Sequence, residues 1–274
     1  MKSCEEIAWM TVADDRLPVI VHTPSAAPAW VMLIVVGGPQ YRVGSHRQFV
    51  LAARAFAAQG VACVRFDYRG MGDATGAPRD FLAVEEDISA AVAFTRARFP
   101  SSRVCLYGLC DGASAIALWL RRASCDAVVL INPWVFQEHT AAETRLRSYY
   151  LRRLVSPEFW RKLLSFQLNV RESSRSLGTT LRELGGGDDA GSYVAGMLEG
   201  LRAFSGAGYL VLSGDDLTAA EFQALCRKDE QWGSLFASDN WANATYQDAD
   251  HTFSEREVFD QSHAAMLTWL GDLS

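Results

Sequence analysis

The stretch RVCLYGLCDGASAIALWL, residues 103–120, decides the fold because a strand, a sharp turn and a helix follow one another within it. Arg103–Leu109 is expected to form a short buried strand, and Gly112–Arg122 is expected to form a helix. Between them, Gly108 and Gly112 flank Cys110 at two residues on either side. This pattern is typical of the nucleophile elbow, a tight strand-to-helix turn that holds a nucleophilic side chain above a sheet. Cys110 is therefore the candidate nucleophile, and a buried structural thiol is the alternative.

Strand and helix patterns alternate on both sides of this stretch. The continuous apolar run Trp30–Val36 is typical of a strand that is buried on both faces of a parallel sheet. Such alternation predicts an α/β fold with a mostly parallel central sheet, helices on both faces, and ligands bound at the carboxyl ends of the strands. The expected strands are residues 18–22, 30–36, 61–68, 103–109, 127–132, 209–213 and 244–247, and the expected helices are 45–59, 84–99, 112–122, 219–227 and 255–270.

The alternation breaks between residues 133 and 207, where helical patterns follow one another without a strand. We therefore expect a core made of residues 1–132 and 208–274, and a helical cap, or lid, made of 133–207. Aromatic side chains of the cap are candidates for an apolar acyl site, and its arginines for contacts with a phosphate group or with the acidic surface of a carrier protein. The alternatives are cap packing and a solvated helix face. The aromatic candidates are Trp134, Phe136, Tyr149, Tyr150, Phe159, Trp160 and Phe166, and the arginines are Arg145, Arg147, Arg152, Arg153 and Arg161.

Composition narrows the class of protein. The 274 residues carry a net charge of −6, which argues against a nucleic-acid partner. The longest apolar run, residues 29–36, is far too short to span a bilayer, and the N-terminal residues lack the apolar segment of a secretory signal. We therefore expect a cytoplasmic protein without a membrane span. Six cysteines without CxxC spacing predict free thiols and no metal site.

A thiol nucleophile needs a base, and His251 is the best-placed histidine. It follows an expected strand and precedes the last expected helix, so its loop can reach the elbow. His46, close to the loop at residues 37–41, is the second candidate. Cys110 itself sits at the start of a helix, and the positive end of that helix is expected to lower the pKa of the thiol.

The third group should be a carboxylate after the strand at residues 209–213, to orient the imidazole. Asp216 is preferred over Asp215 because it lies one residue deeper in the loop. An oxyanion hole needs two N–H donors. The backbone N–H of Asp111 is one expected donor. Pro39 has no N–H, so the second donor is Gln40 or Gly38, with Gln40 preferred.

The chain order Cys110, Asp216, His251 is that of the α/β-hydrolase superfamily, which this sequence resembles over essentially its whole length. The segments that carry the resemblance are VVGGPQ (35–40), FDYRGMGDATG (66–76), GLCDGAS (108–114), SGDD (213–216) and DADHTF (248–253). GGPQYRVGSHRQF (37–49), GLCDGASA (108–115) and SGDDLTAAEF (213–222) resemble more narrowly the exosortase A system-associated hydrolases. The cysteine at the elbow is similar to that of dienelactone hydrolases and of cysteine-dependent thioesterases and acyltransferases.

Cysteine chemistry favours one reaction class. A thiolate exchanges readily with a thioester, and the resulting acyl-enzyme is itself a reactive thioester. We therefore expect a cofactor-free acyl thioester hydrolase or acyltransferase whose substrate is a small acyl ester or thioester, such as an acyl-CoA or an acyl carrier protein. A carboxylesterase or lactone hydrolase resembling dienelactone hydrolase is the first alternative. A non-catalytic binding protein on a hydrolase fold is the second.

Overall fold

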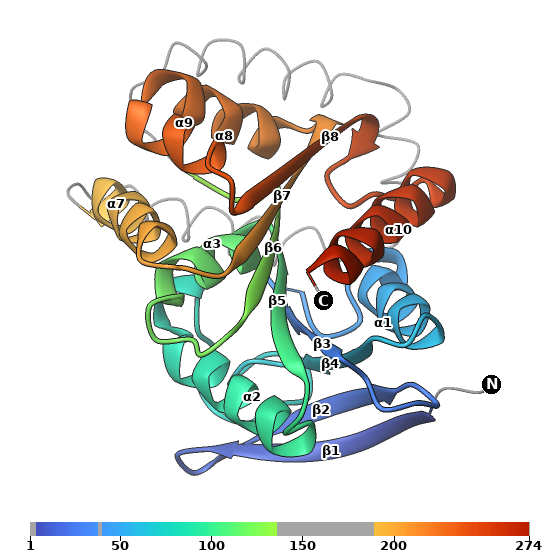
Figure 1. The fold of residues 1–274 in the computed structure, drawn as a ribbon. Coiled ribbons are helices and arrows are strands. Elements are labelled where there is room, and N and C mark those ends of the chain that lie inside the picture. The colour runs from blue at the N-terminus through green and yellow to red at the C-terminus, as the bar shows by residue number, and fades with distance from the viewer. Residues whose placement is uncertain (1–3, 38–39, 136–188, 274) are drawn as a thin grey trace, which may run out of the picture. The chain divides into compact units, whose positions relative to one another are not determined.

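The computed structural model describes residues 4–37, 40–135 and 189–273, and within these ranges eight strands form one sheet. The strands follow the order β1-β2-β4-β3-β5-β6-β7-β8 (Figure 1). Pairs β1–β2 and β2–β4 are antiparallel, whereas all the other neighbouring pairs are parallel. The expected α/β-hydrolase fold is thus confirmed. The strands are β1 (Cys4–Val12), β2 (Asp15–Thr23), β3 (Trp30–Val35), β4 (Ala62–Phe66), β5 (Arg103–Leu109), β6 (Ala127–Ile131), β7 (Ala207–Asp215) and β8 (Trp241–Asp250).

The central strands form the core because their sequences are apolar on both faces. Every residue of β3, β4 and β6 is buried, and β5 is buried from Val104 onward. β3 pairs in parallel with β5, and β5 with β6, so their carboxyl ends lie at the same edge of the sheet. The loops after these strands are therefore held by the most deeply buried part of the molecule.

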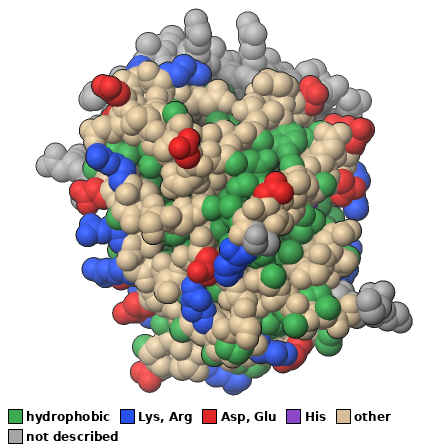
Figure 2. Space-filling model, in the orientation of Figure 1, with side chains coloured by type: hydrophobic (Ala, Val, Ile, Leu, Met, Phe, Trp, Pro, Cys, Tyr) green, Lys and Arg blue, Asp and Glu red, His purple; other side chains and the backbone are tan. Residues whose placement is uncertain are grey.

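Helices cover both faces of the sheet. α1 and α10 lie on one face, where the Phe56 ring of α1 packs 5.5 Å from His263 of α10, and α2 and α3 lie on the other (Figure 1). Figure 2 shows hydrophobic side chains gathered on the viewed face over the region of β8 and α10. The ring of Trp269 in α10 packs against that of Tyr209 in β7, with the centroids 5.3 Å apart. The α-helices are α1 (Gln48–Ala58), α2 (Glu85–Arg98), α3 (Asp111–Trp119), α7 (Asp189–Arg202), α8 (Leu217–Lys228), α9 (Glu230–Phe236) and α10 (Arg256–Asp272), and the 3₁₀ turns are η1 (Ser45–Arg47) and η2 (Phe81–Ala83).

The largest differences from the sequence expectation concern β1, β8 and α9. β1 was not expected, because its residues CEEIAWMTV are mostly exposed and charged at the start, as befits an edge strand. β8 extends over Trp241–Asp250 instead of 244–247, and it is also an edge strand with alternating exposure. α9 is a short helix that the periodicity did not indicate. Trp232 and Phe236 anchor it against Phe222 of α8.

The chain divides into two compact units, residues 1–135 with 196–274, and residues 136–195. The first unit contains the whole sheet. Most of the predicted cap, 133–207, lies outside the described residues, so its boundaries and its role stay predictions. None of the helices in the described ranges is both long and apolar enough to cross a membrane.

Acid is expected to destabilise the fold through two buried histidines. Burial lowers the pKa of His263 to about 4, and burial together with the charge of Arg65 lowers that of His22 to about 4. The unfolded chain therefore binds more protons than the folded one between pH 6.5 and 4, so stability is present at neutral pH and is lost as the pH falls through that window. Each histidine should remove about 2 kcal/mol of unfolding free energy by pH 4.5. Urea unfolding at pH 7.5 and pH 4.5 measures the loss.

The matched variant is His263→Gln, whose amide does not titrate but still reaches the carbonyl oxygen of Phe259, which His263 Nδ1 contacts at 2.8 Å. The variant should lose less stability than the wild type between the two pH values. Equal losses in the two proteins would show that His263 is not responsible.

Candidate active site

Cys110 occupies a strained turn between β5 and α3. Its φ of 59° and ψ of −127° lie outside the conformations that side chains other than glycine usually adopt. The turn is held by its backbone, because Cys110 N–H donates to the Ile131 carbonyl at 2.9 Å and the Cys110 carbonyl accepts from Ser114 N–H at 3.1 Å. The residue thus stands at the carboxyl end of β5 and caps α3, as the elbow pattern predicts.

Glycines allow the loop after β3 to come close to the elbow. A Cβ on Gly37 would lie 2.2 Å from Asp111 Oδ1 and 2.4 Å from the backbone nitrogen of Gly112. A Cβ on Gly112 would lie 2.5 Å from the Val35 carbonyl oxygen. Any larger residue at either position would push the two loops apart, so this packing explains the small residues on both sides.

Backbone strain is concentrated at one edge of the sheet. Of the six non-glycine residues with positive φ in the described ranges, only Ala13 lies elsewhere, in the β1–β2 turn. The other five lie in loops that follow parallel strands, at the carboxyl edge. They are His46, Arg47, Cys110, Asn132 and Phe253. Strain of this kind persists only where the surroundings enforce it, and it clusters at functional sites.

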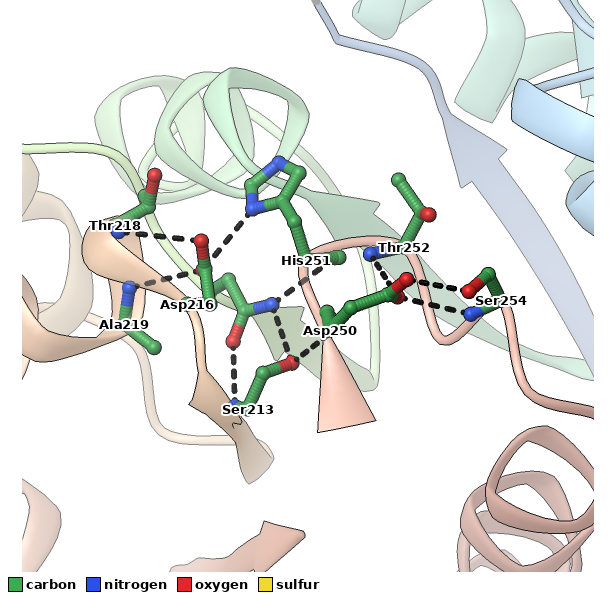
Figure 3. A network of polar contacts seen from close by, with 9 residues as sticks. Ser213, Asp216, Thr218, Ala219, Asp250, His251, Thr252 and Ser254 are labelled. Carbon is green, nitrogen blue, oxygen red and sulfur yellow. Dashed lines mark hydrogen bonds and ion pairs between the residues drawn. The ribbon is translucent and has the colours of Figure 1, made fainter. Parts of the chain in front are cut away.

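His251 and Asp216 meet at this edge (Figure 3). His251 Nδ1 lies 3.0 Å from Asp216 Oδ2, although the ring N–H is poorly aligned with that oxygen. The Asp216 side chain is 8% exposed and that of His251 is 34% exposed, so the carboxylate is shielded while the imidazole reaches solvent. The pairing orients the ring with its other nitrogen, Nε2, directed away from the carboxylate.

Asp216, rather than Asp215, is the carboxylate beside His251. Asp216 caps α8 by accepting from the backbone N–H of Ala219 at 3.0 Å and of Thr218 at 3.3 Å. These bonds fix its carboxylate with one oxygen toward the imidazole. Asp215 is still part of β7 and pairs with Asp250 in the ladder. The helix cap therefore explains why the deeper of the two aspartates takes this place.

His46, the second candidate base, contacts the residue after His251 instead. Its Nε2 lies 3.1 Å from Thr252 Oγ1, which joins the loop after β3 to the loop after β8. Asp250 shapes the latter loop by accepting hydrogen bonds from Thr252 N–H at 3.1 Å and from Ser254 N–H at 2.9 Å (Figure 3).

The expected low pKa of the Cys110 thiol is not found. Burial raises the pKa, and the negative charges of Asp111 and Asp216 raise it further, while a backbone hydrogen bond from Asp111 works in the opposite direction. Desolvation of a thiolate and two nearby carboxylates outweigh the helix N-terminus. The sulfur therefore keeps its proton at neutral pH, and its use as a nucleophile would require a base.

Cys110 and the His251–Asp216 pair lie within electrostatic reach, since the charge of Asp216 acts on the thiol. Within the described ranges, no hydrogen bond joins Cys110 Sγ to the His251 ring. In apo structures, catalytic hydrogen bonds are often long and tighten only when substrate binds. The catalytic roles of Cys110, His251 and Asp216 remain predictions.

Other predicted site residues are only partly described. The side chain of Gln40 donates to Ser45 Oγ at 3.0 Å, and its role as an oxyanion donor, like that of Asp111, remains a prediction. Gly38 and the cap candidates other than Trp134 lie outside the described residues. The Trp134 backbone N–H donates to the Cys110 carbonyl at 3.4 Å, and its ring packs against Phe81 with the centroids 5.6 Å apart. The described residues hold no group of three or more His, Cys, Asp or Glu side chains that could bind a metal ion.

Sequence reasoning missed Asn132 and Ser213 as residues that support the site. Asn132 Nδ2 donates to Ser213 Oγ at 2.8 Å and to the His251 carbonyl at 3.2 Å. A polar residue directly after the buried strand AVVLI is a visible signal, but the sequence does not show which loop it contacts.

Comparisons with known proteins show the family and the fold of the chain. The model of the Hydrolase_4 family, described as serine aminopeptidase S33, matches residues 29–177. The quorum-quenching protein AidA of Acinetobacter baumannii (strain MDR-ZJ06) is 32% identical over 110 residues, which are 38% of this chain and 35% of that protein. The matched segment thus spans about a third of the length of this relative.

Two solved structures share the fold over nearly the whole chain. The Pyrococcus furiosus esterase superposes with a TM-score of 0.71 at 15% identity and covers 98% of this chain and 91% of its own. Dienelactone hydrolase from Anabaena variabilis gives a TM-score of 0.64 at 11% identity and covers 99% of both chains. The family match extends over more than half of the 274 residues and includes the elbow, so the chain belongs to the Hydrolase_4 (serine aminopeptidase S33) family of α/β-hydrolases.

Proposed function

We propose that the protein is an acyl thioester hydrolase or acyltransferase that works through a covalent acyl-enzyme on Cys110. His251 is the general base and acid, and Asp216 orients its ring. The observation that carries the proposal is the 3.0 Å contact between His251 Nδ1 and Asp216 at the same sheet edge as the strained Cys110 turn. The family description names serine, so cysteine at the elbow is the feature that sets this chain's chemistry apart.

The first half-reaction forms the acyl-enzyme. His251 Nε2 takes the proton from Cys110 Sγ as the sulfur attacks the carbonyl carbon of the substrate. The resulting oxyanion accepts hydrogen bonds from the backbone N–H of Asp111 and from a second donor, Gln40. When the tetrahedral intermediate collapses, the bond to the leaving thiol breaks, and the thiol takes the proton from His251.

The second half-reaction releases the acyl group. His251 takes a proton from water, an alcohol, an amine or another thiol, and this acceptor attacks the carbonyl carbon of the acyl-enzyme. Cys110 then leaves as a thiol with the proton from His251. A thioester on Cys110 is close in free energy to a thioester substrate, so neither half-reaction is strongly uphill. Substrates whose leaving group is the thiol of coenzyme A or of an acyl carrier protein are thioesters and meet this energetic condition.

Hydrolysis of an oxygen ester or lactone is the second candidate. The proteins that share this fold support it, because they include an esterase and a dienelactone hydrolase. The same three residues would then act on a substrate whose leaving group is an alcohol.

The proposal is tested with matched substrates. The protein is incubated with N-acetylcysteamine thioesters and with oxygen esters of the same acyl groups, and its intact mass is recorded at short times. We expect an increase equal to the acyl group, localised to Cys110 by peptide mapping and absent from the Cys110→Ala variant.

The outcomes separate the candidates. Adducts and turnover with thioesters support the proposal, whereas turnover of oxygen esters alone supports the second candidate. No adduct and no turnover with either series would contradict both and indicate a binding protein on a hydrolase fold.

A further inference from the structure

Two buried polar residues, Asn132 and Ser213, form a clamp that connects the ends of β6, β7 and β8 next to His251. Asn132 follows β6 and is fully buried, with a φ of 45°. Its N–H donates to the Val211 carbonyl at 3.0 Å, which anchors it to β7. Positive φ is uncommon for residues other than glycine, but asparagine adopts it more readily than most, and the side-chain bonds of Asn132 add to its stability.

The Asn132 side chain is fully engaged. Its Oδ1 accepts from the Ser213 backbone N–H at 2.9 Å, and its Nδ2 donates both to Ser213 Oγ at 2.8 Å and to the His251 carbonyl at 3.2 Å. A residue of another shape or charge would leave buried donors or acceptors unpaired. The amide is thus specified by its partners, which lie on β7 and directly after β8.

Ser213 continues the clamp to β8. It is 2% exposed, and its Oγ donates to the Asp250 carbonyl at 2.9 Å (Figure 3). Two successive carbonyls are therefore held by hydrogen bonds, that of Asp250 by Ser213 and that of His251 by Asn132. His251 itself lies outside regular structure, because β8 ends at Asp250 and α10 begins at Arg256.

We propose that Asn132 and Ser213 are positioning residues that hold the His251 main chain so that its ring faces Asp216 on one side and the nucleophile on the other. This inference rests on the proposed role of His251. Asp216 fixes only the ring, whereas the clamp fixes the backbone from which the ring projects. Both restraints are needed, since a displacement of about 1 Å in a catalytic group can cost about 10²-fold in rate.

The test measures kcat, KM and the NMR resonances of the His251 ring in a set of variants. Ser213→Ala removes the hydroxyl, and Asn132→Asp keeps the size and the acceptor but loses both N–H donors. Each should lower kcat by roughly 10- to 100-fold with little change in KM. Each should also shift the His251 ring resonances in ¹H–¹⁵N spectra, assigned by their absence in His251→Gln. Ser213→Thr restores the hydroxyl and should recover most of the kcat and the wild-type ring signal.

The matched control is Ser102→Ala. Ser102 is also a buried serine that donates to a carbonyl, that of Pro28 at 2.6 Å, but it lies just before β5, at the opposite edge of the sheet. Ser102→Ala should lose about as much stability against urea as Ser213→Ala does, but it should keep the wild-type kcat and His251 ring resonances.

Unchanged ring signals in Ser213→Ala and Asn132→Asp would overturn the inference, whatever the activity. An inactive wild type with ring signals that still shift in these variants would contradict the proposed function and leave the clamp supported. Loss of kcat in Ser102→Ala equal to that in Ser213→Ala would show that the effect is general destabilisation.

Discussion

Replacing Cys110 by alanine is expected to lower kcat/KM for acyl thioesters by about 10⁴-fold, because no covalent intermediate can form without the sulfur. The strained backbone should tolerate the smaller side chain, and the fold should persist. Steady-state release of free thiol, measured with a chromogenic disulfide, gives the rate, and urea unfolding gives the stability.

Cys110→Ser separates the chemistry of sulfur from the geometry of the turn. The serine variant should still be acylated, but its oxygen ester lies lower in free energy than the thioester, so return of the acyl group to a thiol becomes uphill. We therefore expect exchange between an acyl thioester and free N-acetylcysteamine to be lost more completely than hydrolysis.

Cys125→Ser is the matched control for both variants. Cys125 is another partly exposed cysteine, located just before β6 at the opposite edge of the sheet. It should keep wild-type rates. A Cys110→Ala variant that retained exchange activity would show that another group carries the acyl transfer.

Asp216→Asn is expected to lower kcat by about 10³- to 10⁴-fold, because an amide cannot stabilise the imidazolium that forms during attack. Asparagine is as good a helix cap as aspartate, so α8 should keep its start and the stability should change little. The loss would therefore report on catalysis rather than on folding. The rate is measured with the same thioester as above.

A second measurement on this variant should move in the opposite direction. The Asp216 charge raises the pKa of Cys110, so its removal should lower that pKa and increase the thiolate fraction. Iodoacetamide should consequently modify Cys110 faster at pH 7.5 in Asp216→Asn than in the wild type, even though turnover falls. Asp215→Asn is the matched control and should change neither quantity much. A larger loss of turnover in Asp215→Asn would reassign the carboxylate.

The sequence predicted those elements whose pattern is local. Continuous apolar runs mark β3, β5 and β6, because both faces of a central parallel strand are buried. The elbow at Cys110 could likewise be predicted, since a tight turn needs glycine at fixed positions around it. β1 was missed because most of its residues are exposed and its start is charged, which hides the strand pattern. α9 was missed because a helix of seven residues is too short to show a clear period.

Properties that depend on three-dimensional neighbours could not be predicted. The pKa of Cys110 was expected to fall because only the helix end is visible in the sequence, whereas burial and the position of Asp216 appear only in the fold. Likewise, Asn132 and His251 are 119 residues apart, and nothing in either segment indicates their hydrogen bond. Asp216 was preferred over Asp215 because it lies one residue deeper in the loop. The structure gives a physical reason for its place beside His251, because Asp216 caps α8 and its carboxylate is thereby held.

The two acidic neighbours of the sulfur bear on how the protein withstands oxidative stress. Peroxide attacks the deprotonated form of a cysteine, and burial, together with the charges of Asp111 and Asp216, disfavours that form at Cys110. The resting enzyme should thus escape conversion to sulfenic acid under conditions that inactivate thiol enzymes with a standing thiolate. In the proposed mechanism, His251 withdraws the proton only when a substrate is attacked, so hydrogen peroxide should modify the resting thiol slowly.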